Sequence, residues 1–261
     1  MVSTSHAAFS ERATDVARLP AGPVEYRLEG DGPRTVLVFH GGHARAGLPL
    51  GEEVFTDAGF TVLAPSRSGY GRTPLTMAAR HPHLAERVIL QSSVGFLPWP
   101  DRLTRLGGRV VFHARLEAGT WAIMRFLIRV APSLGLRLLL RDLSVLPTRQ
   151  VLEGLSAAER ATLAGLFTVM RSGSGFVADM LPVPDCAAQV SQPALVIATR
   201  QDRSVPFAHA ESLAAAMPNA ALVDSRADSH MIWFGPDYPT SPRRSVISLP
   251  QAEHAAAGRR T

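Results

Sequence analysis

The sequence contains no lysine and a single cysteine, and both scarcities limit what the protein can be. All 27 basic residues are arginines, and they are interleaved with 22 acids to give a formal net charge of only +5. Because no basic stripe stands out, the sequence predicts no nucleic-acid partner. The lone Cys186 excludes an internal disulfide and a cysteine metal cluster. We predict no metal site and no cofactor, and a cytoplasmic location is favoured.

The chain also lacks a long apolar run. A membrane-spanning helix needs about 18 consecutive apolar residues, and the nearest approach, residues 121–140, is interrupted by Arg125, Arg129 and Arg137. We interpret this stretch as amphipathic helix and predict no membrane partner. With 46% hydrophobic and 19% charged residues, the 261-residue chain suits one sizeable core, either alone or with an inserted lid.

Short apolar runs that end in glycine, proline or serine alternate with helical segments. Strands are predicted within residues 34–42, 59–71, 86–93, 191–206 and 220–225, with helices at 48–58 and 207–217. Residues 22–33 alternate as an antiparallel edge strand would. This alternation of strands and helices favours an α/β fold with a mostly parallel sheet and helices on both faces.

One segment breaks the alternation. Residues 95–185 contain arginine-rich amphipathic helical patterns and few strand signals, and they lie between two strand units. We therefore predict the N-terminal part of an α/β core at 1–94, an inserted helical cap at 95–185, the C-terminal part of the core at 186–239 and a loose tail at 240–261.

Five motifs occur in a meaningful order: VLVFHGG, VLAPSRSGYGRT, MAARHPHLAERVIL, PALVIATRQDRSVP and SRADSHMIWFGP. Together they resemble the α/β-hydrolase superfamily, in its esterase, peptidase and dehalogenase-like branch with a helical cap. The resemblance covers residues 22–239, and its strength comes from the order, because each motif alone is weak.

The resemblance implies roles for individual residues. Gly41 and Gly42 would form the oxyanion-binding turn, with the backbone N–H donor at Gly42 or, alternatively, at His43. Asp202, after the strand at 191–206, would be the triad acid. His230, 28 residues later, would be the general base.

Substrate contacts are predicted from the turn and from aromatic residues of the cap region. His40 precedes the glycine turn, and Trp99 and Trp121 are candidates to line a small-molecule site, together with Phe126. Ordinary core packing is the alternative for the aromatic residues.

The nucleophile is what the sequence does not contain. The fold carries it on a strand-to-helix elbow of the form G-x-S-x-G, and no such pentapeptide occurs; the nearest match, RSGSGF at 171–176, is interpreted as a loop. In the family, a helix, the central strand and the elbow follow the GYGRT loop, whereas here the end of a helix follows Leu75 at once. We predict that about 40 residues are missing between Leu75 and Thr76.

Two consequences follow from this gap. Ser66, Ser68, Ser92 and Ser93 lie near strand ends, but none has the sequence of an elbow, so none is expected to replace the nucleophile. The sheet would lose its central strand, and unpaired buried backbone groups cost about 1–3 kcal/mol each. Either residues 86–93 move into the vacancy, or the protein folds poorly.

The predicted function is therefore an impaired hydrolase. The ancestral activity would be hydrolysis of an ester or related acyl substrate through a Ser-His-Asp triad. A catalytically inactive protein that binds a small apolar ligand, or an internally deleted product without function, is the alternative. A dehalogenase with an Asp nucleophile also stays open, because that Asp would lie on the elbow that the sequence lacks. The substrate and the oligomeric state are left open.

Overall fold

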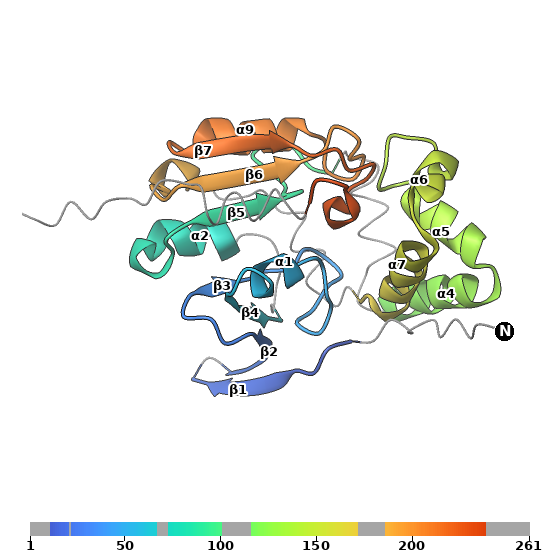
Figure 1. Ribbon diagram of the computed structural model, residues 1–261, viewed down its shortest axis with the longest axis horizontal. Helices are drawn as coiled ribbons and strands as arrows, with labels where there is room; N and C mark the ends of the chain where they lie inside the picture. Colours follow the sequence, from blue (N-terminus) through green and yellow to red (C-terminus); the bar gives the residue numbers. More distant parts are fainter. Residues whose placement is uncertain (1–10, 21, 67–72, 101–115, 172–185, 239–261) are drawn as a thin grey trace, which may run out of the picture.

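The computed structural model describes residues 11–20, 22–66, 73–100, 116–171 and 186–238, and its arrangement is shown in Figure 1. A first sheet has the strand order β1-β2-β4-β3. Its strands are β1 (Asp15–Leu19), β2 (Gly22–Glu29), β3 (Thr35–Leu37) and β4 (Thr61–Pro65). A second sheet has the order β5-β6-β7. Its strands are β5 (Val88–Gln91), β6 (Ala194–Ala198) and β7 (Ala220–Asp224).

The strand directions confirm a mostly parallel α/β fold. β3 pairs with β4 in parallel, and β5–β6 and β6–β7 are parallel too. The N-terminal pairs, β1–β2 and β2–β4, are antiparallel. Every residue of β6 is buried, which agrees with its unbroken apolar sequence ALVIA.

The edge strands β3 and β5 of the two sheets face each other where the central strand was predicted to be missing. Within the described residues, β3 and β5 each have a strand neighbour on one side only, and Figure 1 shows the three-stranded sheet lying apart from the four-stranded one. The predicted shift of residues 86–93 into the vacancy does not take place, because β5 pairs with β6 and, within the described residues, is not hydrogen-bonded to β3. β6 thus keeps its backbone hydrogen bonds to β5 and β7, and the sheet is interrupted between β3 and β5.

Side chains connect the two sheets in place of a strand. Helix α1 (Glu53–Thr56) lies between them, and its Val54 packs against apolar clusters of both sheets, as does Ile89 of β5. An ion pair of 2.7 Å joins Arg34 to Glu86 across the same boundary. Because both ends of this ion pair are exposed, it contributes at most about 1 kcal/mol. The apolar contacts carry most of the connection.

The predicted junction lies inside a continuous helix. Helix α2 (Thr73–Arg80) runs through Leu75 and Thr76 without a break. A proline is well tolerated in the first turn of a helix, and Pro74 is the second residue of this one. Leu75 and Ala78 are buried in one cluster with strands β5 and β6.

The remaining helices are of two kinds. One covers the second sheet: α9 (Ala208–Ala216), with Ala210 and Leu213 buried against β6. The others form a separate layer beside the sheets (Figure 1). This helical layer consists of α4 (Glu117–Val130), α5 (Pro132–Leu140), α6 (Thr148–Gly154) and α7 (Ala157–Val169).

The helical layer has its own apolar core, to which Trp121, Leu136 and Leu163 contribute. Helix α7 begins with a capping box, in which Ser156 and Glu159 satisfy each other's backbone N–H groups. The layer falls inside the segment predicted as a cap, 95–185. The tail predicted at 240–261 lies outside the described residues.

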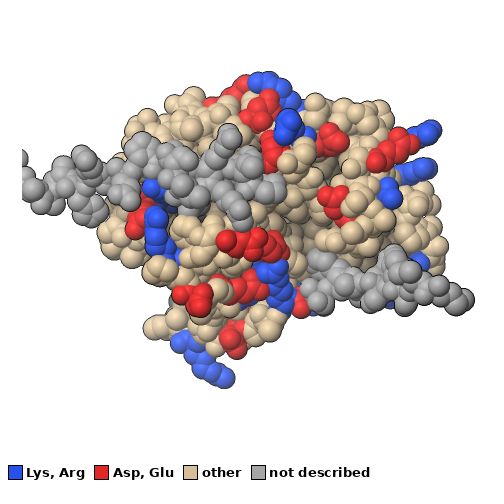
Figure 2. All heavy atoms as spheres, viewed as in Figure 1, with Lys and Arg blue, Asp and Glu red and all other residues tan. Residues whose placement is uncertain are grey.

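Short 3-10 turns complete the described part: η1 (Pro82–Leu84), η2 (Ala187–Gln189) and η3 (Ile232–Phe234). Among the residues described here, no helix has the length and apolarity needed to cross a membrane. Acidic and basic side chains are interspersed over the face shown in Figure 2. The absence of a nucleic-acid partner stays a prediction.

Candidate functional site

Asp202 and His230 meet at the carboxyl end of the second sheet. Asp202 lies on the loop after β6, and His230 follows β7; the distance between His230 Nδ1 and Asp202 Oδ2 is 2.7 Å. The other carboxylate oxygen accepts a hydrogen bond of 2.8 Å from the N–H of Val205, and Asp202 is buried. A carboxylate in this position orients the imidazole and stabilises its protonated form, leaving Nε2 to exchange a proton.

The backbone of His230 is fixed by groups that the sequence did not indicate. Its N–H donates to the carbonyl of Leu143 at 2.8 Å, and its carbonyl accepts a hydrogen bond of 3.1 Å from Ser92 Oγ. Ser144, the next residue after Leu143, forms a bridge with Asp202. The connection between α5 and α6 therefore holds both the acid and the base. Nothing in the local sequence of Leu143 and Ser144 distinguishes them from ordinary loop residues.

The glycine turn predicted to bind an oxyanion lies beside this pair. Gly41 is exposed, Gly42 is half-buried, and His43 adopts a left-handed backbone conformation with φ of 71°. Burial of the ring and, secondarily, the nearby imidazole of His230 lower the pKa of His43 to about 3. His43 is thus neutral near pH 7, and its ring packs edge-on against Trp121 with centroids 5.4 Å apart.

This environment predicts a pH effect on stability. The unfolded chain binds a proton at His43 below pH 6.5, whereas the folded protein does so only near pH 3. Stability is therefore lost as the pH falls through this window. We expect His43→Asn, which keeps a residue tolerant of the left-handed conformation, to reduce the loss in urea melts at pH 7, 5 and 4.

The matched control is His83→Asn, because His83 is exposed. This variant should follow the parent protein at every pH. An equal acid sensitivity of the His43→Asn and parent proteins would contradict the assignment.

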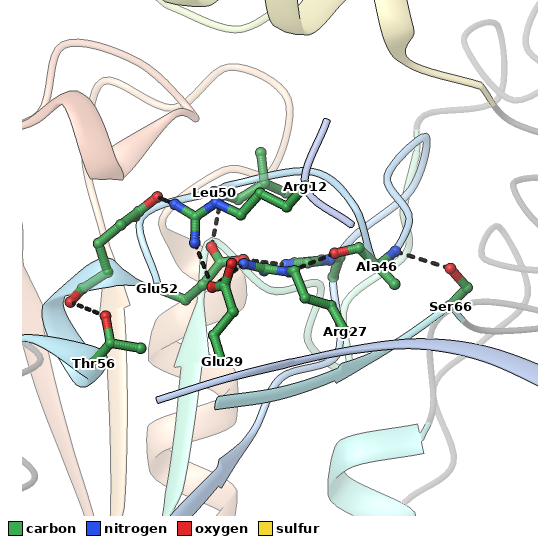
Figure 3. Close-up of polar contacts among 10 residues, drawn as sticks. Arg12, Arg27, Glu29, Ala46, Leu50, Glu52, Thr56 and Ser66 are labelled. Carbon is green, nitrogen blue, oxygen red and sulfur yellow. Dashed lines mark hydrogen bonds and ion pairs between the residues drawn. The ribbon is translucent and has the colours of Figure 1, made fainter. Parts of the chain in front are cut away.

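A buried charge cluster lies next to the segment that follows the glycine turn, and Figure 3 shows its contacts with Ala46 and Leu50. Arg27 and Glu52 are 1% and 2% exposed and form an ion pair, and Arg27 Nε donates to the carbonyl of Ala46 at 2.7 Å. Glu52 also accepts a hydrogen bond of 2.6 Å from the N–H of Leu50. Desolvation lowers the pKa of Arg27, and the neighbouring Glu29 opposes that shift. The cluster ties β2 to the loop that carries the turn.

His40 belongs to this cluster. Its Nε2 lies 3.2 Å from Glu52 Oε1, and the residue is buried. The predicted substrate contact of His40 remains a prediction, and its observed contact with Glu52 favours a role in fixing the turn instead.

The predicted aromatic contacts are distributed unevenly. Trp121 is buried and reaches the site through His43. Trp99 donates from Nε1 to the carbonyl of Ser204 at 2.6 Å, so it packs on the loop that carries Asp202. Phe126, by contrast, is 63% exposed and points away from the helical core.

The described candidate serines are engaged elsewhere. Ser66 Oγ donates to Glu25 at 2.5 Å, and Ser93 Oγ donates to the carbonyl of Gln91. Ser92 follows β5 with φ of 43°, but its hydroxyl contacts the backbone of His230 rather than the ring. Among the described residues, no hydroxyl is hydrogen-bonded to the imidazole of His230. Ser68 and most of the 171–176 loop lie outside that part of the chain.

The other histidines that the structure describes do not contact Asp202 and His230 by a hydrogen bond. His209 is buried and accepts a hydrogen bond from the N–H of Gly95, while His81 and His83 are exposed. His113 lies outside the described residues. Across the described ranges, no three His, Cys, Asp or Glu side chains gather into a possible metal site.

Comparisons with known proteins identify the fold. An α/β hydrolase fold protein from Nakamurella multipartita superposes with a TM-score of 0.67 at 20% identity, covering 90% of this chain and 98% of that one. The chain has the α/β-hydrolase fold. A serine hydrolase from Cycloclasticus zankles is similar too, with a TM-score of 0.55 at 16% identity over 90% of this chain and 96% of its own. No family model matches the chain.

A relative found by sequence is also named as a hydrolase. The uncharacterized hydrolase YcgS of Bacillus subtilis (strain 168) is 23% identical over 270 aligned positions, covering 86% of this chain and 94% of the relative. The aligned part of this chain is 86% of its 261 residues, or about 224 residues. The alignment has 270 positions, so about 46 of them have no counterpart in this chain.

Proposed function

We propose that this protein derives from a hydrolase of esters or related acyl substrates and retains the acid and the base of a Ser-His-Asp triad without the nucleophile. The observation that carries the proposal is the 2.7 Å contact between His230 and the buried Asp202. A carboxylate and an imidazole in this relation form the proton-transfer half of an acyl-transfer site.

Three observations support the loss of the nucleophile. The sequence contains no G-x-S-x-G elbow. The sheet is split between β3 and β5, where the strand that leads to an elbow would lie. The alignment with the Bacillus subtilis relative leaves about 46 positions without a residue in this chain.

The remaining groups perform only part of the reaction. In a complete site, His230 would take the proton of the serine hydroxyl as the oxygen attacks the substrate carbonyl, and return it to the leaving group. The turn at Gly41 and Gly42 would donate one N–H to the oxyanion, but the second donor follows the nucleophile and is lost with it. Since one oxyanion donor is worth about 10²–10³ in rate, both losses reduce turnover strongly.

We therefore expect no serine-dependent turnover. A fluorophosphonate probe should leave the purified protein unlabelled, and the hydrolysis rate of p-nitrophenyl acetate should match the buffer rate. The variants His230→Ala and Asp202→Asn should give the same rate as the parent. A rate abolished by His230→Ala, or labelling at a defined serine, would contradict the proposal.

A second candidate function is binding of a small apolar ligand without turnover. It is favoured by the contact of Trp121 with the neutral ring of His43, beside His230. This arrangement offers an apolar wall next to polar groups, as ligand sites commonly do. Both candidates predict an unlabelled protein, so ligand binding separates them. Saturable quenching of the tryptophan fluorescence by a small apolar ligand is expected of a binder, and its absence would contradict this second function.

A further inference from the structure

Helix α4 is apolar on two faces, and only one of them is covered. The inner face places Trp121 and Ile128 in the core of the helical layer. The outer face carries a second set of apolar residues at spacings of seven, three and four, which is the spacing of one helix side. We call this set the outer stripe; its members are Leu116, Ile123, Phe126 and Val130, exposed by 52%, 62%, 63% and 59%.

The neighbouring helix adds to this surface. Leu134 and Leu138 of α5, four residues apart, are 50% and 41% exposed. A surface helix normally has one apolar stripe facing the core and polar residues opposite. Exposed apolar side chains concentrated on adjacent helices mark a surface that binds something, whereas single exposed ones do not.

Basic side chains accompany the outer stripe. Arg129, Arg137 and Arg141 are exposed, and none of them forms an ion pair within the described residues. Helices α4 and α5 together contain three arginines and one acidic residue, Glu117, so their net charge is positive. The charge of this surface is therefore complementary to an anionic partner.

We propose that the outer stripe of α4, with the exposed leucines of α5, docks on a lipid bilayer that contains anionic head groups. Apolar side chains of a surface-lying helix enter the boundary between head groups and acyl chains, while arginines remain at the level of the phosphates. The combination of exposed apolar residues with unpaired arginines fits this partner. The inner face of the same helix carries Trp121, so the docked side is the one opposite His43.

This inference changes an expectation from the sequence. The interrupted apolar run at 121–140 excluded a membrane span, and no membrane partner was predicted. A helix that lies on a bilayer needs no span, and it needs an uncovered apolar face. The inference does not depend on catalytic activity or on the missing nucleophile.

The test is cosedimentation of the full chain with vesicles. We expect binding to vesicles of equal parts phosphatidylglycerol and phosphatidylcholine, weakened by salt, and little binding to phosphatidylcholine alone. Ile123→Gln combined with Phe126→Gln should lower the partition coefficient by at least about tenfold. Replacing Arg129 or Arg137 by Gln should lower it by about fivefold each.

The matched control is Leu84→Gln. Leu84 is 63% exposed, like Phe126, and lies on η1, away from the helical layer (Figure 1). This variant should bind as the parent does, and circular dichroism of all variants should be unchanged because every substituted residue is exposed.

Two results would overturn the proposal. One is a parent protein that stays in the supernatant with anionic vesicles. The other is a dimer in analytical ultracentrifugation that Ile123→Gln/Phe126→Gln dissociates while vesicle binding is unaltered, because the outer stripe would then be an interface between two copies of this chain.

Discussion

A chimera that receives between Leu75 and Thr76 a segment of about 40 residues with the central strand and the elbow of an active α/β hydrolase is expected to react with a fluorophosphonate probe. The reacting group should be a serine inside the inserted segment, where we expect the G-x-S-x-G elbow. Asp202 Oδ2 and His230 Nδ1 are already 2.7 Å apart. The insertion therefore adds a serine to an imidazole that Asp202 already orients. Hydrolysis of p-nitrophenyl acetate should rise by a factor of at least about 10³.

Two control variants define this gain. The chimera with its elbow serine replaced by alanine, and the chimera with His230→Ala, should both lose the gained rate. The serine-to-alanine chimera should still melt at a higher temperature than the parent, because the inserted strand would pair with β3 and β5. A folded chimera whose serine remains unlabelled would show that Asp202 and His230 do not serve as acid and base.

Replacing Glu52 by Gln is expected to lower the free energy of unfolding by about 3–5 kcal/mol. Glu52 is the buried partner of Arg27 and also accepts from Leu50 and His40. Without its charge, the buried guanidinium of Arg27 keeps Glu29 as its ion-pair partner among the described residues, with Glu53 acting on it only electrostatically. Since native proteins are stable by about 5–15 kcal/mol, this single change approaches the total. Urea denaturation followed by circular dichroism measures it.

The matched control is Arg149→Ala, which breaks an ion pair on the surface. Arg149 and Glu153 are 2.7 Å apart but mostly exposed, so the expected change is within about 0.5 kcal/mol. A double variant, Arg27→Met with Glu52→Leu, should be less destabilised than Glu52→Gln, because it leaves no buried charge without a partner. A loss below about 1 kcal/mol for Glu52→Gln would mean that the cluster does not stabilise the fold.

The strands and the acid–base pair could be predicted because their signals are local or ordered along the chain. The run ALVIA becomes the fully buried strand β6, and the positions of Asp202 and His230 after their strands bring them together as predicted. Parallel strands place their carboxyl ends at one edge of a sheet, so residues that follow two such strands meet there.

Other features depend on contacts that no local pattern reveals. The pairing of β5 with β6 rather than β3 was not predicted, because a run of three apolar residues, VIL, fits either neighbour equally well. His40 contacts Glu52, and Glu52 is also paired with Arg27 of β2, which lies far from both in the sequence. The apolar spacing of α4 indicated helix correctly but did not distinguish its covered face from the exposed one.

By itself the sequence determined that Asp202, His230 and the glycine pair Gly41–Gly42 are present and that a G-x-S-x-G pentapeptide is not, because residue identity and order are properties of the chain. Only the tertiary structure decided that the sheet divides between β3 and β5, that Arg27 and Glu52 support the turn and that one apolar face of α4 stays exposed. These outcomes follow from burial and hydrogen bonding between residues far apart in the chain, where each contact forms only in competition with the others.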